Sequence, residues 1–297
     1  MKKIALVDGS SYIYRAFYAL PPLTAPDGRP TGAIYGFLRM ILKLINDLNP
    51  EYIAVIFDKG KITFRTKQYE DYKATRKETP DELKQQIPEI KRLLKLFGIK
   101  VLEKEGFEAD DIIATLAKKA KNKGFKVYVV TPDKDMMQLV SENIYLLNPV
   151  SNIIFDKEKV KEKYGVYPEQ FIDYQALVGD TVDNIIGVKG VGPKTASKLL
   201  NQYGNIENIL NHLDELSPKL QKAFQEAIDR LEKNRFLVKL DDNVPLDIEI
   251  ENLKREKIDW ESLIKEFEKL GFKSLLKEIG NKEQKYEKKE KSQRTLF

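Results

Sequence analysis

The first 150 residues alternate between short apolar runs and longer amphipathic stretches. Short apolar runs bounded by polar residues are typical of buried strands, whereas apolar positions three and four residues apart are typical of helices. The predicted strands are Ile4–Val7, Tyr52–Phe57, Val127–Thr131 and Ile144–Leu147. The predicted helices are Ile34–Leu48, Asp81–Phe97 and Ala109–Lys121. Strands that alternate with helices predict an α/β domain with a central, mostly parallel sheet flanked by helices.

The pattern changes in the second half of the chain. From about residue 166 every periodic stretch indicates helix, with Pro and Gly between the stretches. We therefore expect an α/β domain over residues 1–165 and a smaller, all-helical domain over residues 166–280. Residues 281–297 are rich in Lys and Glu and poor in apolar side chains, which is typical of a disordered charged tail.

The stretch Lys59–Thr79 fits neither pattern, because it is basic and aromatic and lacks a continuous apolar face. Long connections of this kind inside a compact domain are usually functional or disordered. The segment from Lys59 to Lys100 contains 12 Lys or Arg and 6 Asp or Glu, which is a local net charge of +6 in a chain whose total net charge is +5. Asn184–Ile206 holds three Lys and no acid. Basic segments separated from clustered acids favour a polyanionic ligand beside an acidic pocket.

The residue types that are missing limit the chemistry. The chain has no cysteine and one histidine, His212, which is expected to be an exposed helix residue. Thiol catalysis is therefore excluded, and both a zinc centre and a Ser-His-Asp triad are disfavoured. A bound metal would be hard and held by oxygen. No apolar run approaches the about 18 residues of a membrane helix, and the first apolar run is too short and too acidic for a secretory signal, so we expect a cytoplasmic protein.

Acidic residues follow the predicted strands and open a predicted helix. Ligand sites in open parallel sheets lie beyond the carboxyl ends of the strands, so these side chains are expected to converge. The acids are Asp8, Asp58, Glu108, Asp110, Asp111, Asp133, Asp135, Asp180 and Asp183, of which the last two would share a helix or turn face. Each one alone is better explained as a cap or turn residue. Together they would repel one another unless cations neutralised them, and two magnesium ions roughly 4 Å apart could activate water against a phosphodiester.

A glycine-rich segment runs from Gly187 to Ala196. A Walker A loop is rejected, because Pro193 precedes Lys194 and no strand is predicted before the segment, and its spacing is not that of a dinucleotide fingerprint. The remaining interpretation is a helix–hairpin–helix over about residues 184–200, which would bring backbone N–H groups to a phosphate at the start of a helix. A plain turn between helices is the alternative.

Six motifs follow one another over roughly residues 3–275. They are Leu6-Val7-Asp8-Gly9, Val55-Ile56-Phe57-Asp58, Tyr72-Lys73-Ala74-Thr75-Arg76, Glu108-Ala109-Asp110-Asp111, Thr131-Pro132-Asp133-Lys134-Asp135 and Gly179-Asp180-Thr181-Val182-Asp183-Asn184. Each motif is weak alone, but all six in this order are specific. The chain resembles the 5′-nuclease domain of bacterial DNA polymerase I, a member of the flap-endonuclease superfamily.

The resemblance implies a PIN-like nuclease core with a helical arch over about residues 59–97, through which a 5′ single strand passes. It implies two or more Mg²⁺ or Mn²⁺ ions in the active site. The first metal cluster would comprise Asp8, Asp58, Glu108, Asp110, Asp111 and Asp133. The second would comprise Asp135, Asp180 and Asp183, with Asp110 and Asp133 near both. Lys73 and Arg76 of the arch, with Asp8 and Asp133, are the expected catalytic residues.

The resemblance also implies the DNA contacts. Tyr72 lies where an aromatic ring can stack on a base, beside Lys73 and Arg76. Arg65 belongs to the same basic connection, and Arg15 is expected to contact the phosphate near the cut. The glycine hairpin is expected to grip the duplex backbone and to hold a potassium ion on its carbonyls. Its contact residues would be Gly187, Lys189, Gly190, Gly192, Lys194, Thr195 and Lys198.

The implied activity is 5′–3′ exonuclease and 5′-flap endonuclease cleavage of DNA that leaves a 5′-phosphate, in replication and repair, where flaps, nicks and RNA primers are the substrates. We expect a monomer associated with the nucleoid and not with a membrane. Two alternatives stay open, an RNA-directed PIN-like nuclease and a non-catalytic module that holds DNA junctions. The segment Gln293–Phe297 resembles a sliding-clamp-binding pentapeptide, with Gln293, Leu296 and Phe297 as its contacts.

Overall fold

The computed structural model describes residues 1–280, which fold as two compact units. The first unit consists of Met1–Asp8, Ile56–Glu78 and Leu102–Ile250, and the second of Gly9–Val55, Thr79–Val101 and, within the described residues, 251–280. Each unit is assembled from segments that are distant in the sequence. This grouping differs from the predicted domains over residues 1–165 and 166–280, which stay a prediction.

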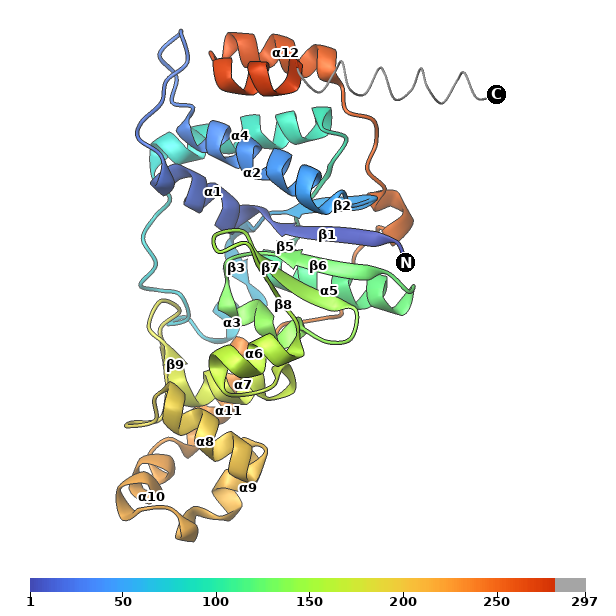
Figure 1. The fold of residues 1–297 in the computed structure, drawn as a ribbon. Helices are drawn as coiled ribbons and strands as arrows, with labels where there is room; N and C mark the ends of the chain where they lie inside the picture. Colours follow the sequence, from blue (N-terminus) through green and yellow to red (C-terminus); the bar gives the residue numbers. More distant parts are fainter. Residues whose placement is uncertain (281–297) are drawn as a thin grey trace. The chain divides into compact units, whose positions relative to one another are not determined.

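The first unit is organised around four strands that lie in the order β1-β6-β7-β8 (Figure 1). The strands are β1 (Lys3–Asp8), β6 (Lys126–Val130), β7 (Ile144–Asn148) and β8 (Ile153–Phe155). β6 pairs in parallel with β1 and with β7, and β8 is antiparallel to β7. Successive residues of β1 are buried, so both of its faces are covered, which explains its continuous apolar run. The predicted α/β fold with a mainly parallel sheet is confirmed.

Two elements place acids at one edge of this sheet. α5 (Ala109–Asn122) packs against β1 and β6, and its N-cap residue is Glu108. The short 3-10 helix η1 (Lys134–Leu139) follows β6, and its N-cap is Asp133. Acidic residues in the first turn of a helix are stabilised by the positive end of the helix dipole.

The basic stretch after residue 58 contains regular structure that its sequence pattern does not predict. β3 (Lys59–Thr63) pairs in parallel with β5 (Glu105–Gly106), and α3 (Phe64–Gln68) follows β3 directly. Thr63 caps α3, because its hydroxyl accepts a hydrogen bond from the Thr66 N–H. These elements are at most five residues long, too short for a periodic pattern to be visible.

The remainder of the first unit is mostly helical, as predicted (Figure 1). Its helices are α6 (Lys157–Tyr164), η2 (Pro168–Gln170), α7 (Phe171–Val178), α8 (Pro193–Tyr203), α9 (Ile206–Asn211), η3 (Leu213–Glu215), α10 (Pro218–Gln225) and α11 (Ile228–Val238). The expectation that this region is wholly helical was wrong at one place. β9 (Gly179–Asp180) and β10 (Ile185–Ile186) form an antiparallel hairpin between α7 and α8. Gly179 allows it, because its φ is +78° and a Cβ there would lie 2.4 Å from the Gly187 nitrogen.

The second unit contains long amphipathic helices around a core of its own. Its elements are α1 (Gly9–Ala19), α2 (Gly32–Leu48), β2 (Tyr52–Ile56), α4 (Asp81–Leu96), β4 (Lys100–Leu102), η4 (Ile250–Leu253) and α12 (Trp260–Lys269). α2 packs against α1 and against α4. The buried Gln86 links α4 to α2, because its Oε1 accepts hydrogen bonds from the N–H groups of Ala33 and Ile34 at 2.9 and 3.2 Å.

Within residues 1–280 no helix combines the length and the apolar character that a bilayer span requires. The predicted tail, and with it the predicted clamp contacts Gln293, Leu296 and Phe297, lies outside the described residues.

Candidate active site

The carboxyl ends of β1 and β6 lie side by side, because the two strands are parallel and Val7 pairs with Val130. Asp8 therefore lies beside the segment that follows β6. The Thr131 hydroxyl donates to Asp8 Oδ2 at 2.8 Å, and the Asp133 N–H donates to Thr131 Oγ1 at 3.1 Å. Thr131 thus joins two acids that are more than 120 residues apart in the sequence.

A first acidic cluster forms around Asp110, in the first turn of α5. Burial raises the pKa of its carboxyl well above the usual range, and the charges of Asp8, Asp133 and Asp58 raise it further, while Lys73 lowers it. Asp58 accepts a hydrogen bond from the Ala109 N–H at 2.8 Å, which holds it at the start of the same helix. The structure thus brings four of the predicted acids together.

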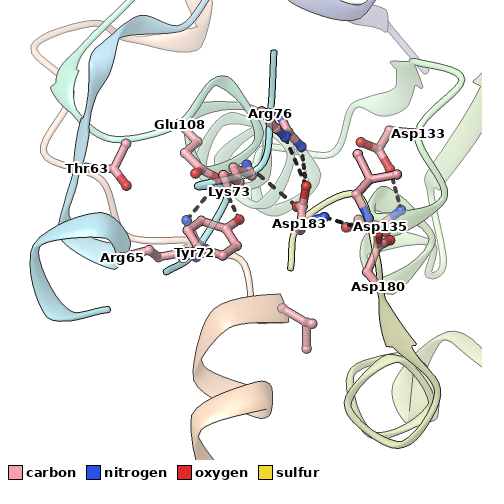
Figure 2. Close-up of polar contacts among 12 residues, drawn as sticks. Thr63, Arg65, Tyr72, Lys73, Arg76, Glu108, Asp133, Asp135, Asp180 and Asp183 are labelled. Carbon is pink, nitrogen blue, oxygen red and sulfur yellow. Dashed lines mark hydrogen bonds and ion pairs between the residues drawn. The ribbon is translucent and has the colours of Figure 1, made fainter. Parts of the chain in front are cut away.

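A second acidic cluster comprises Asp135 of η1 with Asp180 and Asp183 of the β9–β10 hairpin, and Figure 2 shows these side chains with Asp133. The Asp180 carboxylate shapes the hairpin turn, because its Oδ1 accepts from the N–H groups of Val182 and Asp183. Asp180 and Asp183 share this turn and not a helix. Burial raises the pKa of Asp135 to about 6, and the charges of Asp133 and Asp183 add to this effect, whereas Lys134 opposes it. Asp133 is therefore close to both clusters.

Lys134 is a site residue that the sequence interpretation missed. Its ammonium lies 2.9 Å from Asp135 Oδ1 and also pairs with Asp180. Burial alone would lower the pKa of Lys134, but the two carboxylates raise it above the ordinary value. The residue sits inside the quoted Thr131–Asp135 motif, so a cation between two acids was visible in the sequence.

Lys73 and Arg76 reach the acidic clusters from the basic connection (Figure 2). The Lys73 ammonium lies 2.9 Å from Glu108 Oε2 and 3.8 Å from Asp183 Oδ2. Arg76 Nε donates to Asp183 Oδ1 at 3.0 Å. Burial would lower the pKa of Lys73, but Glu108 and Asp183 raise it above the usual range, so the side chain is charged at neutral pH. Both side chains therefore contact residues of the predicted acidic set.

Tyr72 does not lie as expected for a residue that stacks on a base. Its side chain is 5% exposed and packs against Ile185, Leu237 and Val238. Its hydroxyl donates to Glu108 Oε2 at 3.3 Å. The ring is part of a hydrophobic cluster, so its function here is to support the basic connection and to hold Glu108.

Arg65 and Asp111 also depart from their expected places at the DNA surface and in the metal site. They form a buried, two-pronged ion pair, with Nη1 and Nη2 of Arg65 each 2.8 Å from an oxygen of Asp111. The two side chains are 1% and 0% exposed. Asp111 also accepts from the N–H groups of Glu108 and Asp241. Its oxygens are thus occupied by protein donors, because α3 and the chain after α11 converge on the start of α5.

The remaining predicted contacts are divided between the units. Arg15 lies on α1 in the second unit and is partly buried. In the first unit, His212 is exposed at the end of α9, as expected, and its ring Nδ1 hydrogen-bonds the Asn208 carbonyl.

The glycine hairpin lies directly before α8. The helix that precedes it is α7, so the helix pair spans Phe171–Tyr203 and not 184–200. Gly187 is needed for packing, because a Cβ there would lie 2.4 Å from the Val178 carbonyl oxygen. Gly190 has a φ of +80° and open space around it. Gly192 is the N-cap of α8 and Thr195 is partly exposed, while three hairpin lysines are exposed: Lys189, Lys194 and Lys198.

The donor set suits a hard divalent cation. Every candidate ligand is a carboxylate, and burial, followed by the charges of neighbouring carboxylates, raises the pKa of Asp110 and of Asp135 in the absence of a cation. Within residues 1–280 no three Asp, Glu, His or Cys side chains are already close enough to chelate an ion. Lys73, Arg76 and Lys134 are paired with the acids instead.

Comparison with known proteins places this geometry in a family of nucleases. Residues 3–165 match the family model of the 5′-3′ exonuclease N-terminal resolvase-like domain, and residues 166–261 match that of the 5′-3′ exonuclease C-terminal SAM fold. The chain is 48% identical to a 5′-3′ exonuclease of Aquifex aeolicus over 100% of both sequences. The chain therefore belongs to the 5′-3′ exonuclease family, and it is a hydrolase of the nuclease class.

Two further proteins are similar to this chain, one in sequence and one in fold. DNA polymerase I of Caldicellulosiruptor bescii is 41% identical over 94% of this chain, which spans 33% of that protein. The bacteriophage T5 D15 flap endonuclease, in a pseudo-enzyme-product complex with DNA and metal ions, has a TM-score of 0.67 at 24% identity, over 81% of this chain and 90% of that one.

Proposed function

We propose that the chain cuts DNA near 5′ ends and 5′ flaps by divalent-metal-dependent hydrolysis, leaving a 5′-phosphate. The observation that carries the proposal is the pair of adjacent carboxylate clusters with Lys73 and Arg76 beside them. A phosphodiester is negatively charged and would be repelled by the carboxylates. Metal ions and cationic side chains would neutralise this charge and stabilise the transition state. The T5 relative, crystallised with DNA and metal ions, supports the same substrate class.

Two or more Mg²⁺ or Mn²⁺ ions are the proposed cofactors. Bound divalent ions would lower the pKa of water and stabilise the leaving oxygen. The first site would be held by Asp8, Asp58, Asp110 and Asp133, and the second by Asp135, Asp180 and Asp183. Glu108 serves both sites indirectly, because it fixes Lys73 and Tyr72.

Lys73 and Arg76 would bind the phosphate oxygens of the strand that is cut. Their present partners, Glu108 and Asp183, hold them beside the carboxylates. The raised pKa of Lys73 keeps its charge available for this interaction. Because Lys73 has a φ of +57° and its N–H donates to the Asp183 carbonyl, the backbone fixes the direction of its side chain.

The glycine hairpin would grip the backbone of the duplex. Exposed N–H groups at the start of α8, an open Gly190 and the hairpin lysines form a surface that recognises phosphate and not base sequence. A potassium ion on the hairpin carbonyls would complete this surface. A cavity of about 700 Å³ lies beside the β9–β10 hairpin and is lined by Lys134, Asp180 and Ile186, among others. It would offer room for a DNA strand between the glycine hairpin and the acidic clusters.

The test is cleavage of a labelled 5′-flap duplex and of an RNA hairpin, each with Mg²⁺ or with EDTA. We expect Mg²⁺-dependent cutting of the flap near its base and no cutting of the RNA hairpin. Cleavage of the RNA hairpin alone would favour an RNA-directed nuclease. Binding of the flap without any cleavage in Mg²⁺ or Mn²⁺ would favour a junction-holding module instead.

The setting that we propose is replication and repair in the cytoplasm, at the nucleoid, where a monomer removes RNA primers and flaps. We further propose that Gln293, Leu296 and Phe297 dock in the sliding clamp, which would tether the nuclease to nicked DNA. Clamp binding by calorimetry, with and without Gln293–Phe297, tests this. Equal affinity of both chains, or no binding by either, would contradict it, and flap cleavage without clamp should be unchanged by the deletion.

A further inference from the structure

A buried glutamine lies against the second acidic cluster. Gln175, in α7, is 3% exposed, and its Nε2 donates to Asp135 Oδ1 at 2.5 Å. Its Oε1 is buried and has no hydrogen-bond partner among the described residues. Buried amide oxygens are normally paired, because leaving one unpaired costs stability. The unpaired oxygen must therefore be offset by what the other end of the amide does.

The orientation of this amide is set by Asp135. Turning the amide over would place Oε1 against the Asp135 carboxylate, two acceptors facing one another with no hydrogen between them. Nε2 therefore faces Asp135, and Oε1 faces away from it. The unpaired oxygen is a consequence of holding Asp135.

Asp135 has two partners, and they differ in exposure. Lys134 and Gln175 both contact Oδ1, so Oδ2 has no hydrogen bond within residues 1–280. The Lys134 side chain is 42% exposed, so it has more room to move than a buried side chain. Gln175, by contrast, is buried. The more fixed partner of Asp135 is therefore the neutral amide, which leaves the charge of the carboxylate available.

We propose that Gln175 is a positioning residue for a divalent cation held by Asp135, Asp180 and Asp183. Its Nε2 fixes the Asp135 carboxylate with Oδ2 available to the cation, and the unpaired Oε1 is the cost of this orientation. Partners of this kind orient metal ligands in proteins. The inference rests on the metal dependence proposed above and assigns a residue that the sequence motifs do not include.

A second buried glutamine provides a matched control. Gln86 is 2% exposed, its Oε1 accepts from two backbone N–H groups, and its Nε2 donates to the Glu82 carbonyl. Both ends of that amide are satisfied within the protein, in the unit that lacks the acidic clusters. A glutamine with a purely structural function should behave like Gln86 when it is replaced.

The experiment compares the full chain with Gln175→Leu, Gln86→Leu and Asp135→Asn. Mn²⁺ binding is measured by calorimetry without DNA, and thermal unfolding is measured in EDTA. Asp135→Asn identifies the Mn²⁺ ion held by Asp135, because this variant should not bind it. We expect Gln175→Leu to lower the affinity for that same ion by roughly 10- to 100-fold. Its Tm in EDTA should be equal to or above that of the wild type, because an unpaired buried oxygen is removed. Gln86→Leu should show the reverse, a lower Tm in EDTA and unchanged Mn²⁺ affinity.

Cleavage of a 5′-flap duplex by Gln175→Leu should recover at high Mn²⁺ concentration, since the ligands themselves remain. The inference is overturned if Gln175→Leu binds Mn²⁺ as the wild type does, or if its Tm in EDTA falls as far as that of Gln86→Leu. These outcomes differ from failure of the proposed function, in which the wild type itself would neither bind Mn²⁺ nor cleave.

Discussion

Replacing Asp111 by Asn should destabilise the protein without removing a metal ligand. Asp111 and Arg65 are fully buried and joined by two hydrogen bonds of 2.8 Å. Removing one charge of a buried pair costs about 3–5 kcal/mol, because the other charge remains desolvated, and Arg65 would retain only its longer contact of 3.4 Å with Glu108. At about 2–4 °C per kcal/mol for a unit of this size, Tm should fall by roughly 10 °C.

The neighbouring residue supplies the control. Asp110 lies one position away, but burial and the charges of Asp8 and Asp133 raise its pKa, so its ionised form is unfavourable in the metal-free protein. Asp110→Asn should therefore unfold at the same urea concentration as the wild type, or at a higher one. Both variants are unfolded in urea with EDTA present, and their Mn²⁺ affinities are measured by calorimetry.

If Asp111→Asn were as stable as the wild type in EDTA and bound Mn²⁺ less tightly, Asp111 would be a metal ligand. That result would contradict the structural function assigned to its ion pair with Arg65. A double variant, Arg65→Met with Asp111→Leu, adds a second check. Replacing a buried ion pair by apolar side chains is often neutral, so this variant should recover most of the stability that Asp111→Asn loses.

Further predictions separate the residues that act in cleavage from those that bind DNA. Replacing Lys73 and Arg76 by Ala should slow single-turnover cleavage by about 100-fold with little change in duplex affinity, because these side chains are expected to stabilise charge that develops in the transition state. Replacing the hairpin lysines should instead weaken binding and reduce its salt slope by about 0.9 for each phosphate that is no longer neutralised, measured by fluorescence anisotropy. Asp183→Asn should retain DNA binding in Ca²⁺ while Mg²⁺-dependent cleavage falls by orders of magnitude. The folded-state pKa of Asp135 is raised to about 6, so the wild type loses stability as pH rises from about 4 to 6 and the carboxyl ionises. Asp135→Asn cannot ionise, and its Tm in EDTA should therefore rise relative to that of the wild type over the same pH interval.

Local patterns in the sequence were sufficient for the strands β1, β2, β6 and β7 and for the helices α2, α4 and α5, but not for β4 and β8, which have three residues each. The strand ending at Asp8 and the helix that begins after Glu108 are marked by apolar runs and by acids at a helix start, and those signals depend only on nearby residues. The same holds for the convergence of Asp8 and Asp133, because parallel strands bring their carboxyl ends to one edge. The β9–β10 hairpin escaped prediction because each of its strands is two residues long.

What the tertiary structure decided is the function of each polar residue within these motifs. Asp110 and Asp111 are adjacent and chemically identical, yet one belongs to a cluster of repelling carboxylates and the other neutralises a buried arginine. Arg65, Lys73 and Arg76 are equally basic in sequence, yet the first is enclosed and the other two reach the acids. No local pattern separates these residues, because burial and charge pairing depend on segments that are tens of positions or more away, such as Asp111 for Arg65 and Asp183 for Arg76. The composition and order of the motifs identify the chemistry, whereas the assignment of each charge to metal, DNA or core is made by the packing of distant segments around it.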